Sequence, residues 1–128
     1  MKQTFKCSVR PATLAICRLP PASAIPEWAT ASSWFSITRT ADELSIICEQ
    51  ELVPNDVQAE TGWACIQLQG PFPFDMTGVL AAVLNPLAAA GIGIFAISTF
   101  DTDCILVKAD RLQAAEKALR QAGHERIG

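Results

Sequence analysis

The sequence predicts an α+β fold whose strands and helices follow the order β-α-β-β-α-β, twice within a chain of 128 residues. Two observations predict it. Strand-like and helix-like periodicities alternate in this order through the second half, as in the ferredoxin-like sandwich. Residues 35–47 and 95–107 also have similar sequences, which indicates an internal repeat. Because the first copy is shorter, we expect a truncated repeat over residues 1–60 that shares its sheet with a full repeat over residues 61–128.

The second repeat opens with a predicted strand over residues 63–69, followed by a Gly/Pro-rich loop and a helix. Apolar residues at helical spacing predict that helix, which Gly91 ends as a glycine just past the C-terminus. Asp75 and Thr77 are both candidate N-caps. Pro86 does not suit a helix interior, so we expect it to kink the helix or to begin a new turn.

The rest of the second repeat is a hairpin and a final helix. Short apolar segments over residues 92–98 and 103–108 predict the two strands of the hairpin. Asp110 is the expected N-cap of the last helix, whose alanines and leucines share one face. A short strand over residues 124–127 would complete the order.

The first repeat contains the same elements in reduced form. Strands are predicted over residues 13–18, 34–39 and 43–48, and a helix of at most two turns within residues 23–30. No second helix follows, because the chain from Pro54 onward has the composition of a connector. We therefore expect each repeat to complete the other's sheet.

The two hairpins align at a spacing of 60 residues, and the alternative is two unrelated hairpins. The matched pairs are Ile37 with Ile97, Thr38 with Ser98, and Glu43 with Asp103.

Composition excludes several classes of function. The net charge is −3, only 18% of the residues are charged, and no basic cluster occurs, so we expect neither nucleic acid nor an anionic membrane surface as a partner. The uncharged segment from Met76 to Phe100 is long enough to cross a bilayer. Pro86 and Gly91 interrupt it, which favours a helix, a turn and a buried strand over a transmembrane span.

The five cysteines favour a reduced protein of the cytoplasm. Their number is odd, their spacing is wide, and no Cys-x-x-Cys motif occurs, so neither a disulfide framework nor a zinc site is expected. His124 is the single histidine and has no orienting partner nearby in sequence, so we expect it at the surface. We find no catalytic constellation and expect no enzyme, metal or cofactor.

The loop over residues 70–78 is the most informative candidate site. It precedes a helix, whose first backbone N–H groups and dipole suit a carboxylate. Gly78 would let a ligand approach closely, or would simply allow contact between helix and sheet. Asp101 has the position of a turn former. Asp103 begins an apolar strand, where its carboxylate would either meet a cation or be a solvated strand end.

Two segments of the second repeat resemble ACT domains, which are regulatory modules of amino-acid metabolism with βαββαβ folds. The helix signature is Asp75-Met-Thr-Gly-Val-Leu-Ala81, followed by Leu87-Ala-Ala-Ala-Gly-Ile-Gly-Ile94. Phe95-Ala-Ile-Ser-Thr-Phe-Asp-Thr-Asp103 resembles the ACT regions of aspartate kinases and, more closely, those of small bacterial tandem-ACT proteins and the eukaryotic cytosolic arginine sensors. The likeness covers residues 63–122, and residues 40–48 resemble the first repeat of the bacterial group.

The resemblance implies a ligand between two ACT modules. Backbone amides of residues 78–80 would bind its carboxylate, Thr99 and Phe100 would line the pocket, and Asp103 would bind its cationic end. The arginine sensors have an acidic residue where this chain has Met76, which argues against arginine and leaves a smaller, less cationic or more apolar amino acid. The ligand-binding residues so predicted are Asp75, Met76, Thr77, Gly78, Val79, Leu80, Ser98, Thr99, Phe100 and Asp103.

The predicted function is therefore a non-enzymatic sensor or regulator that binds an amino acid or a similar metabolite. The main alternative is an ACT-like interaction protein without a ligand. A third class, an enzyme, would be supported by a reactive cysteine of depressed pKa. Truncated repeats in a chain of 50% hydrophobic residues also predict a homodimer, since a sheet edge or an apolar face would need cover.

Overall fold

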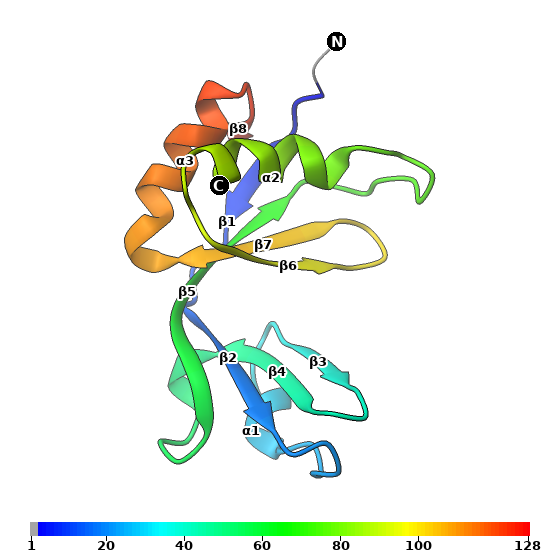
Figure 1. Ribbon diagram of the computed structural model, residues 1–128, viewed down its shortest axis with the longest axis vertical. Coiled ribbons are helices and arrows are strands. Elements are labelled where there is room, and N and C mark those ends of the chain that lie inside the picture. The colour runs from blue at the N-terminus through cyan, green and yellow to red at the C-terminus, as the bar shows by residue number, and fades with distance from the viewer. Residues whose placement is uncertain (1–2) are drawn as a thin grey trace. The chain divides into compact units, whose positions relative to one another are not determined.

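The computed structural model describes residues 3–128, which form two compact units. The N-terminal unit is residues 12–63, and the C-terminal unit joins the described residues up to Pro11 to residues 64–128 (Figure 1). The N-terminal unit is thus inserted after the first strand of the other. The repeats 1–60 and 61–128 are a division of the sequence and remain a prediction.

The sheet of the C-terminal unit has the strand order β8–β1–β5–β7–β6. β1 lies antiparallel to β5 and parallel to β8, and β6 lies antiparallel to β7. The predicted hairpin over residues 92–98 and 103–108 and the predicted strand over residues 63–69 are confirmed. The strands are β1 (Lys6–Val9), β5 (Gln58–Leu68), β6 (Ile94–Ser98), β7 (Asp103–Lys108) and β8 (Glu125–Arg126).

β1 is an element that the sequence analysis did not predict. It lies between β5 and β8, so the last strand of the unit pairs with β1. Phe5, Cys7 and Val9 alternate with polar residues, and Cys7 is buried in the core against α2 and α3. This alternation is the signal of a half-buried strand, but its partners lie more than 50 residues away.

Helices α2 (Val79–Ala89) and α3 (Leu112–Gln121) lie on the same side of this sheet (Figure 1). Their apolar faces and the strands enclose the core of the unit, which confirms the two helical periodicities. The buried core residues are Cys7, Ala64, Ile66, Leu68, Val79, Val83, Leu87, Ile92, Ile105, Val107, Ala115 and Leu119.

The helix caps differ from the prediction. The N-cap of α2 is Gly78, with a left-handed φ of 79°, and no side chain caps the helix, so neither Asp75 nor Thr77 does. Asp110 lies within a short 3₁₀ helix (Ala109–Arg111), and α3 begins after Arg111, also without a side-chain cap. At both helix starts the N-cap residue contributes only its backbone, and no side chain bonds the first N–H groups of the helix.

His124 is not a surface residue, as the sequence had suggested, but is 5% exposed. Its Nδ1 accepts a hydrogen bond from the Phe5 N–H at 3.0 Å, so its Nε2 carries the proton and donates to the Ala82 carbonyl at 2.8 Å. In an unbroken helix that carbonyl would bind the N–H of residue 86, but Pro86 has none. His124 therefore satisfies the carbonyl that Pro86 leaves without a helical partner.

The N-terminal unit has the strand order β3–β4–β2–β5. The first half of β5 pairs with β2, in the place that a last strand would take. β5 therefore runs through both units, and the two modules share one mixed sheet. The elements before it are β2 (Leu14–Leu19), α1 (Glu27–Thr30), β3 (Ser36–Arg39), β4 (Leu44–Glu49) and the 3₁₀ helix η1 (Gln50–Leu52).

The hairpins of the two units are equivalent at a spacing of 59 residues, not 60. Arg39 pairs with Leu44 in one hairpin, and Ser98 pairs with Asp103 in the other. The turns have equal length, and a hairpin's register follows its turn. Leu44, and not Glu43, is thus the counterpart of Asp103.

No helix within residues 3–128 is long and apolar enough to cross a membrane. The uncharged segment from Met76 to Phe100 contains α2, a glycine turn and β6, as the interruptions at Pro86 and Gly91 predict.

Candidate functional site

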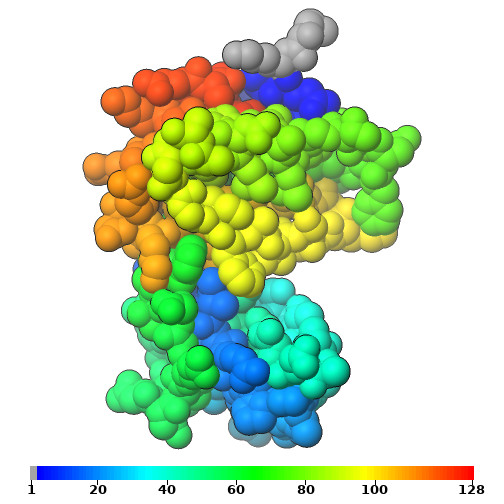
Figure 2. Space-filling view, viewed as in Figure 1, coloured from blue at the N-terminus to red at the C-terminus, as the bar shows by residue number. Residues whose placement is uncertain are grey.

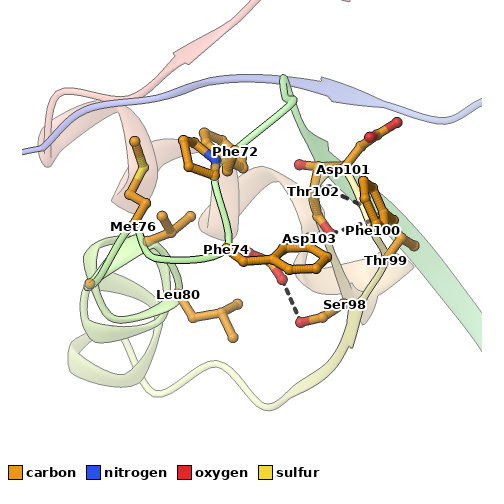
Figure 3. Close-up of a pocket in the computed structure, with 13 residues that line it drawn as sticks. Phe72, Phe74, Met76, Leu80, Ser98, Thr99, Phe100, Asp101, Thr102 and Asp103 are labelled. Carbon is orange, nitrogen blue, oxygen red and sulfur yellow. Dashed lines mark hydrogen bonds between the residues drawn. The ribbon is translucent and has the colours of Figure 1, made fainter.

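A pocket of about 330 Å³ opens in the C-terminal unit between two segments (Figure 3). One segment is the loop from β5 to the start of α2. The other is the end of β6, the turn and the start of β7. The lining residues are Phe72, Pro73, Phe74, Met76, Gly78, Val79, Leu80, Ser98, Thr99, Phe100, Asp101, Thr102 and Asp103.

Hydrogen bonds to backbone carbonyls hold the two segments together. The Phe72 N–H donates to the Asp101 carbonyl at 2.7 Å, and the buried Thr102 hydroxyl donates to the Leu68 carbonyl at 2.9 Å. Gly70 permits this approach, because a Cβ there would lie 2.6 Å from the Asp101 carbonyl oxygen. The turn itself closes through a 2.8 Å bond from the Thr99 N–H to the Thr102 carbonyl.

The start of α2 lies beside the pocket and carries backbone donors without a helical partner. The amides of Val79, Leu80 and Ala81 belong to the first turn, so they have no partner within the helix, and no side chain caps them. The helix dipole adds partial positive charge at the same place. Gly78, Val79 and Leu80 all line the pocket.

Any substitution at Gly78 also has a backbone cost. Its φ of 79° lies in the left-handed region, which β-branched residues rarely adopt. Valine at this position would therefore strain the turn into α2, and its Cβ would lie 3.2 Å from Oε1 of Gln3. Such a variant cannot separate binding from folding.

Asp103 supplies a carboxylate on the opposite side. Its Oδ1 accepts a hydrogen bond from the Ser98 hydroxyl at 2.5 Å across the β6–β7 pair. The side chain is partly exposed and so keeps acceptor capacity for a second donor. The turn former Asp101 is exposed, and in Figure 3 its carboxylate is directed away from Leu80 and Met76.

The loop before α2 lies against the β6–β7 turn at the surface (Figure 2). Two phenylalanines, one from each segment, meet there (Figure 3). The Phe74 and Phe100 rings lie 4.7 Å apart, edge to face, and are 76% and 79% exposed. Met76, also exposed, lines the same pocket. Large apolar side chains this exposed, and gathered beside a cavity, are typical of a binding surface.

The structure brings most of the predicted site residues together. Met76, Gly78, Val79, Leu80, Ser98, Thr99, Phe100 and Asp103 all line the pocket, whereas Asp75 and Thr77 do not.

The sequence analysis missed one aromatic wall of the pocket. This wall consists of Phe72, Pro73 and Phe74. Asp101 and Thr102, in the turn on the other side, also line the pocket and were not among the predicted ligand-binding residues. The run Gly70-Pro-Phe-Pro-Phe74 was a usable signal, since prolines stiffen a loop and two phenylalanines in a stiff loop favour contact with another part of the protein or with a ligand.

In the N-terminal unit an arginine bridges the equivalent two segments. Arg39 is the counterpart of Ser98, and its guanidinium donates hydrogen bonds to the carbonyls of Pro21 and Ser23, in the loop before α1. Asp103 corresponds to the buried Leu44. α1 also has only four residues. The C-terminal unit therefore combines the start of a longer helix, the Asp103 carboxylate and a pocket between them.

The five cysteines are buried and free. Burial raises the pKa of Cys17 to about 11, and it raises the pKa values of Cys7 and Cys48 as well. A hydrogen bond with Cys65 lowers the pKa of Cys104, but this thiol is 1% exposed and beyond the reach of solvent. Within residues 3–128 no three His, Cys, Asp or Glu side chains gather as metal ligands would.

Comparisons with known proteins agree with this geometry. The family model for the ACT domain matches residues 58–121, and a second model, for an N-terminal domain, matches residues 12–56. The chain belongs to the ACT domain family. The ACT model therefore covers the pocket and both helices of the C-terminal unit.

Solved structures extend this ACT fold over the whole chain. Protein Atu0741 of Agrobacterium tumefaciens is 43% identical, with a TM-score of 0.92, over 98% of this chain and 93% of that one. The ligand-free regulatory subunit of aspartate kinase from Thermus thermophilus has a TM-score of 0.60 at 14% identity, over 90% of this chain and 97% of that one, and so shares the fold.

A sequence relative adds a sensor to the comparison. The human cytosolic arginine sensor for mTORC1 subunit 1 is 30% identical over 108 residues, which are 78% of this chain and 32% of the sensor. The chain thus spans about a third of the length of this ACT relative.

Proposed function

We propose that this protein binds one free amino acid per chain, in the pocket of the C-terminal unit, and acts as a non-enzymatic regulator. One observation carries the proposal: residues of the helix start, whose amides have no helical partner, line the same pocket as Asp103. A zwitterion has a carboxylate for the first and an ammonium for the second. A similar metabolite with both charges would fit equally.

The relatives support a regulatory role. The human cytosolic arginine sensor resembles this chain in sequence, and the regulatory subunit of aspartate kinase shares its fold. Five reduced, buried cysteines favour a cytoplasmic protein. A regulator of this kind would pass the ligand's presence to another protein through a change in self-association or docking.

A thermal-shift screen against the common amino acids tests the proposal. A ligand at about a hundred times its dissociation constant should stabilise the protein by about 2.7 kcal/mol. Ser98→Arg should abolish the shift, because its guanidinium would lie across the strand pair from Asp103 and compete with the ligand's ammonium for this carboxylate.

Ala96→Arg is the matched control for this variant. It adds the same charge to an exposed position of β6 outside the pocket, so it should leave the shift intact. A screen without any shift, or a shift that survives Ser98→Arg, would count against the site.

Self-association is a second candidate, which the exposed Phe74–Phe100 pair favours specifically. Two such rings exposed to water favour a covering partner, and a second copy of the chain is the simplest one. We expect light scattering to give the mass of a dimer at micromolar concentrations. The double variant Phe74→Ser, Phe100→Ser should dissociate it, and a monomer mass for the unaltered protein would reject the idea.

A further inference from the structure

We propose that the pocket selects neutral amino acids with an apolar side chain. The inference rests on the proposed amino-acid binding and narrows it to a ligand class. Its basis is the distribution of charge and of apolar surface around the pocket.

The pocket offers a ligand a single carboxylate. Asp101 and Asp103 are the only charged residues among those described as lining it. Asp101 points away from the interior, and its backbone carbonyl is already bonded to the Phe72 N–H. Asp103 is therefore the carboxylate that binds the ammonium of the amino acid.

This distribution disfavours charged ligand side chains of either sign. A second cation, as in a basic amino acid, would find no second carboxylate in the pocket. An acidic side chain would find no lysine or arginine among the described lining residues and would be repelled by Asp103. An unpaired charge moved out of water carries a large desolvation cost, so both classes bind less tightly than a neutral one.

Apolar walls favour a side chain that can use them. Phe72, Phe74, Met76, Leu80 and Phe100 surround the space (Figure 3). Phe74, Met76 and Phe100 are also exposed while the pocket is open. A leucine, methionine or phenylalanine side chain between them would remove apolar surface of both partners from water, and the gain grows with that area.

Calorimetry with six free amino acids tests the class. Leucine, methionine or phenylalanine should bind at least about tenfold more tightly than alanine, arginine or glutamate, since one methylene in an apolar pocket already discriminates by roughly that factor. Tightest binding of arginine would overturn the selectivity while leaving amino-acid binding intact. If none of the six bound, the selectivity would be rejected, and a screen of all the common amino acids without any thermal shift would reject the proposed function as well.

Phe74→Ala separates the apolar wall from the rest of the site. Because the ring is mostly exposed, its loss should not unfold the protein. We expect roughly tenfold weaker binding of leucine or phenylalanine and less than about a twofold change for alanine. Phe35→Ala removes an exposed ring from the N-terminal unit and should change neither affinity. An equal loss for every ligand in Phe74→Ala would contradict the proposed selectivity.

Discussion

His124→Ala should lower the free energy of unfolding by about 2–4 kcal/mol, although the residue lies outside the candidate site. The variant leaves the Phe5 N–H and the Ala82 carbonyl without their partner, and each unsatisfied buried group costs roughly 1–3 kcal/mol. The stacked contact between the imidazole and the Phe5 ring is lost as well. Chemical denaturation of both proteins measures the difference.

A double-mutant cycle with Pro86→Ala identifies the cause. Alanine at position 86 restores an N–H that can bond the Ala82 carbonyl within the helix. His124→Ala should then cost about 1 kcal/mol less than in the unaltered protein, a coupling typical of residues that share a partner. Ala89→Gln, at an exposed position of the same helix, should leave the cost of His124→Ala unchanged. Strict additivity with Pro86→Ala would show that His124 does not replace the missing helical bond.

Asp103→Ala should weaken binding of the amino acid about tenfold to a hundredfold. A charge-assisted hydrogen bond contributes roughly 1.5–3 kcal/mol, and about 1.4 kcal/mol is one decade of affinity. Folding should change little, because Asp103 is partly exposed and its partner, the Ser98 hydroxyl, is free to bond water.

Two further variants calibrate this result. Asp103→Asn keeps the shape and an acceptor oxygen and should lose less affinity than alanine. Asp101→Asn should have little effect, because its side chain points away from the pocket (Figure 3). Calorimetry on the folded variants measures the affinity of each for the amino acid. Equal affinities for Asp103→Ala and the unaltered protein would remove Asp103 from the site, and a larger loss in Asp101→Asn would move the cation contact to residue 101.

Local signals in the sequence were sufficient for most secondary structure and for part of the site. The helical spacing of Val79, Val83 and Leu87 predicted α2, and the same residues are buried in the core. The hairpin over residues 94–108 followed from two short apolar runs around a turn. Such signals depend on neighbours a few residues apart, so one strand or one helix is enough to generate them.

The remaining features depend on residues far apart in the chain. The alternation in β1 was visible, but only its pairing with β5 and β8 makes it a strand of the C-terminal unit. Phe72 and Phe74 became pocket residues because Gly70 brings their loop against the turn at Asp101. Neither contact leaves a periodic trace in the sequence.

The sequence by itself determined the order of the strands and α-helices from β2 onward, the family likeness and the segments on both sides of the pocket. Only the tertiary structure decided the role of His124, whose two partners are 119 and 42 residues away. It also decided that Arg39, and not Thr38, is the counterpart of Ser98, since a shift of one residue in hairpin register changes every counterpart. The physical reason is that periodicity records which face of an element is buried, whereas hydrogen-bond partners and register depend on distant segments that meet only on folding.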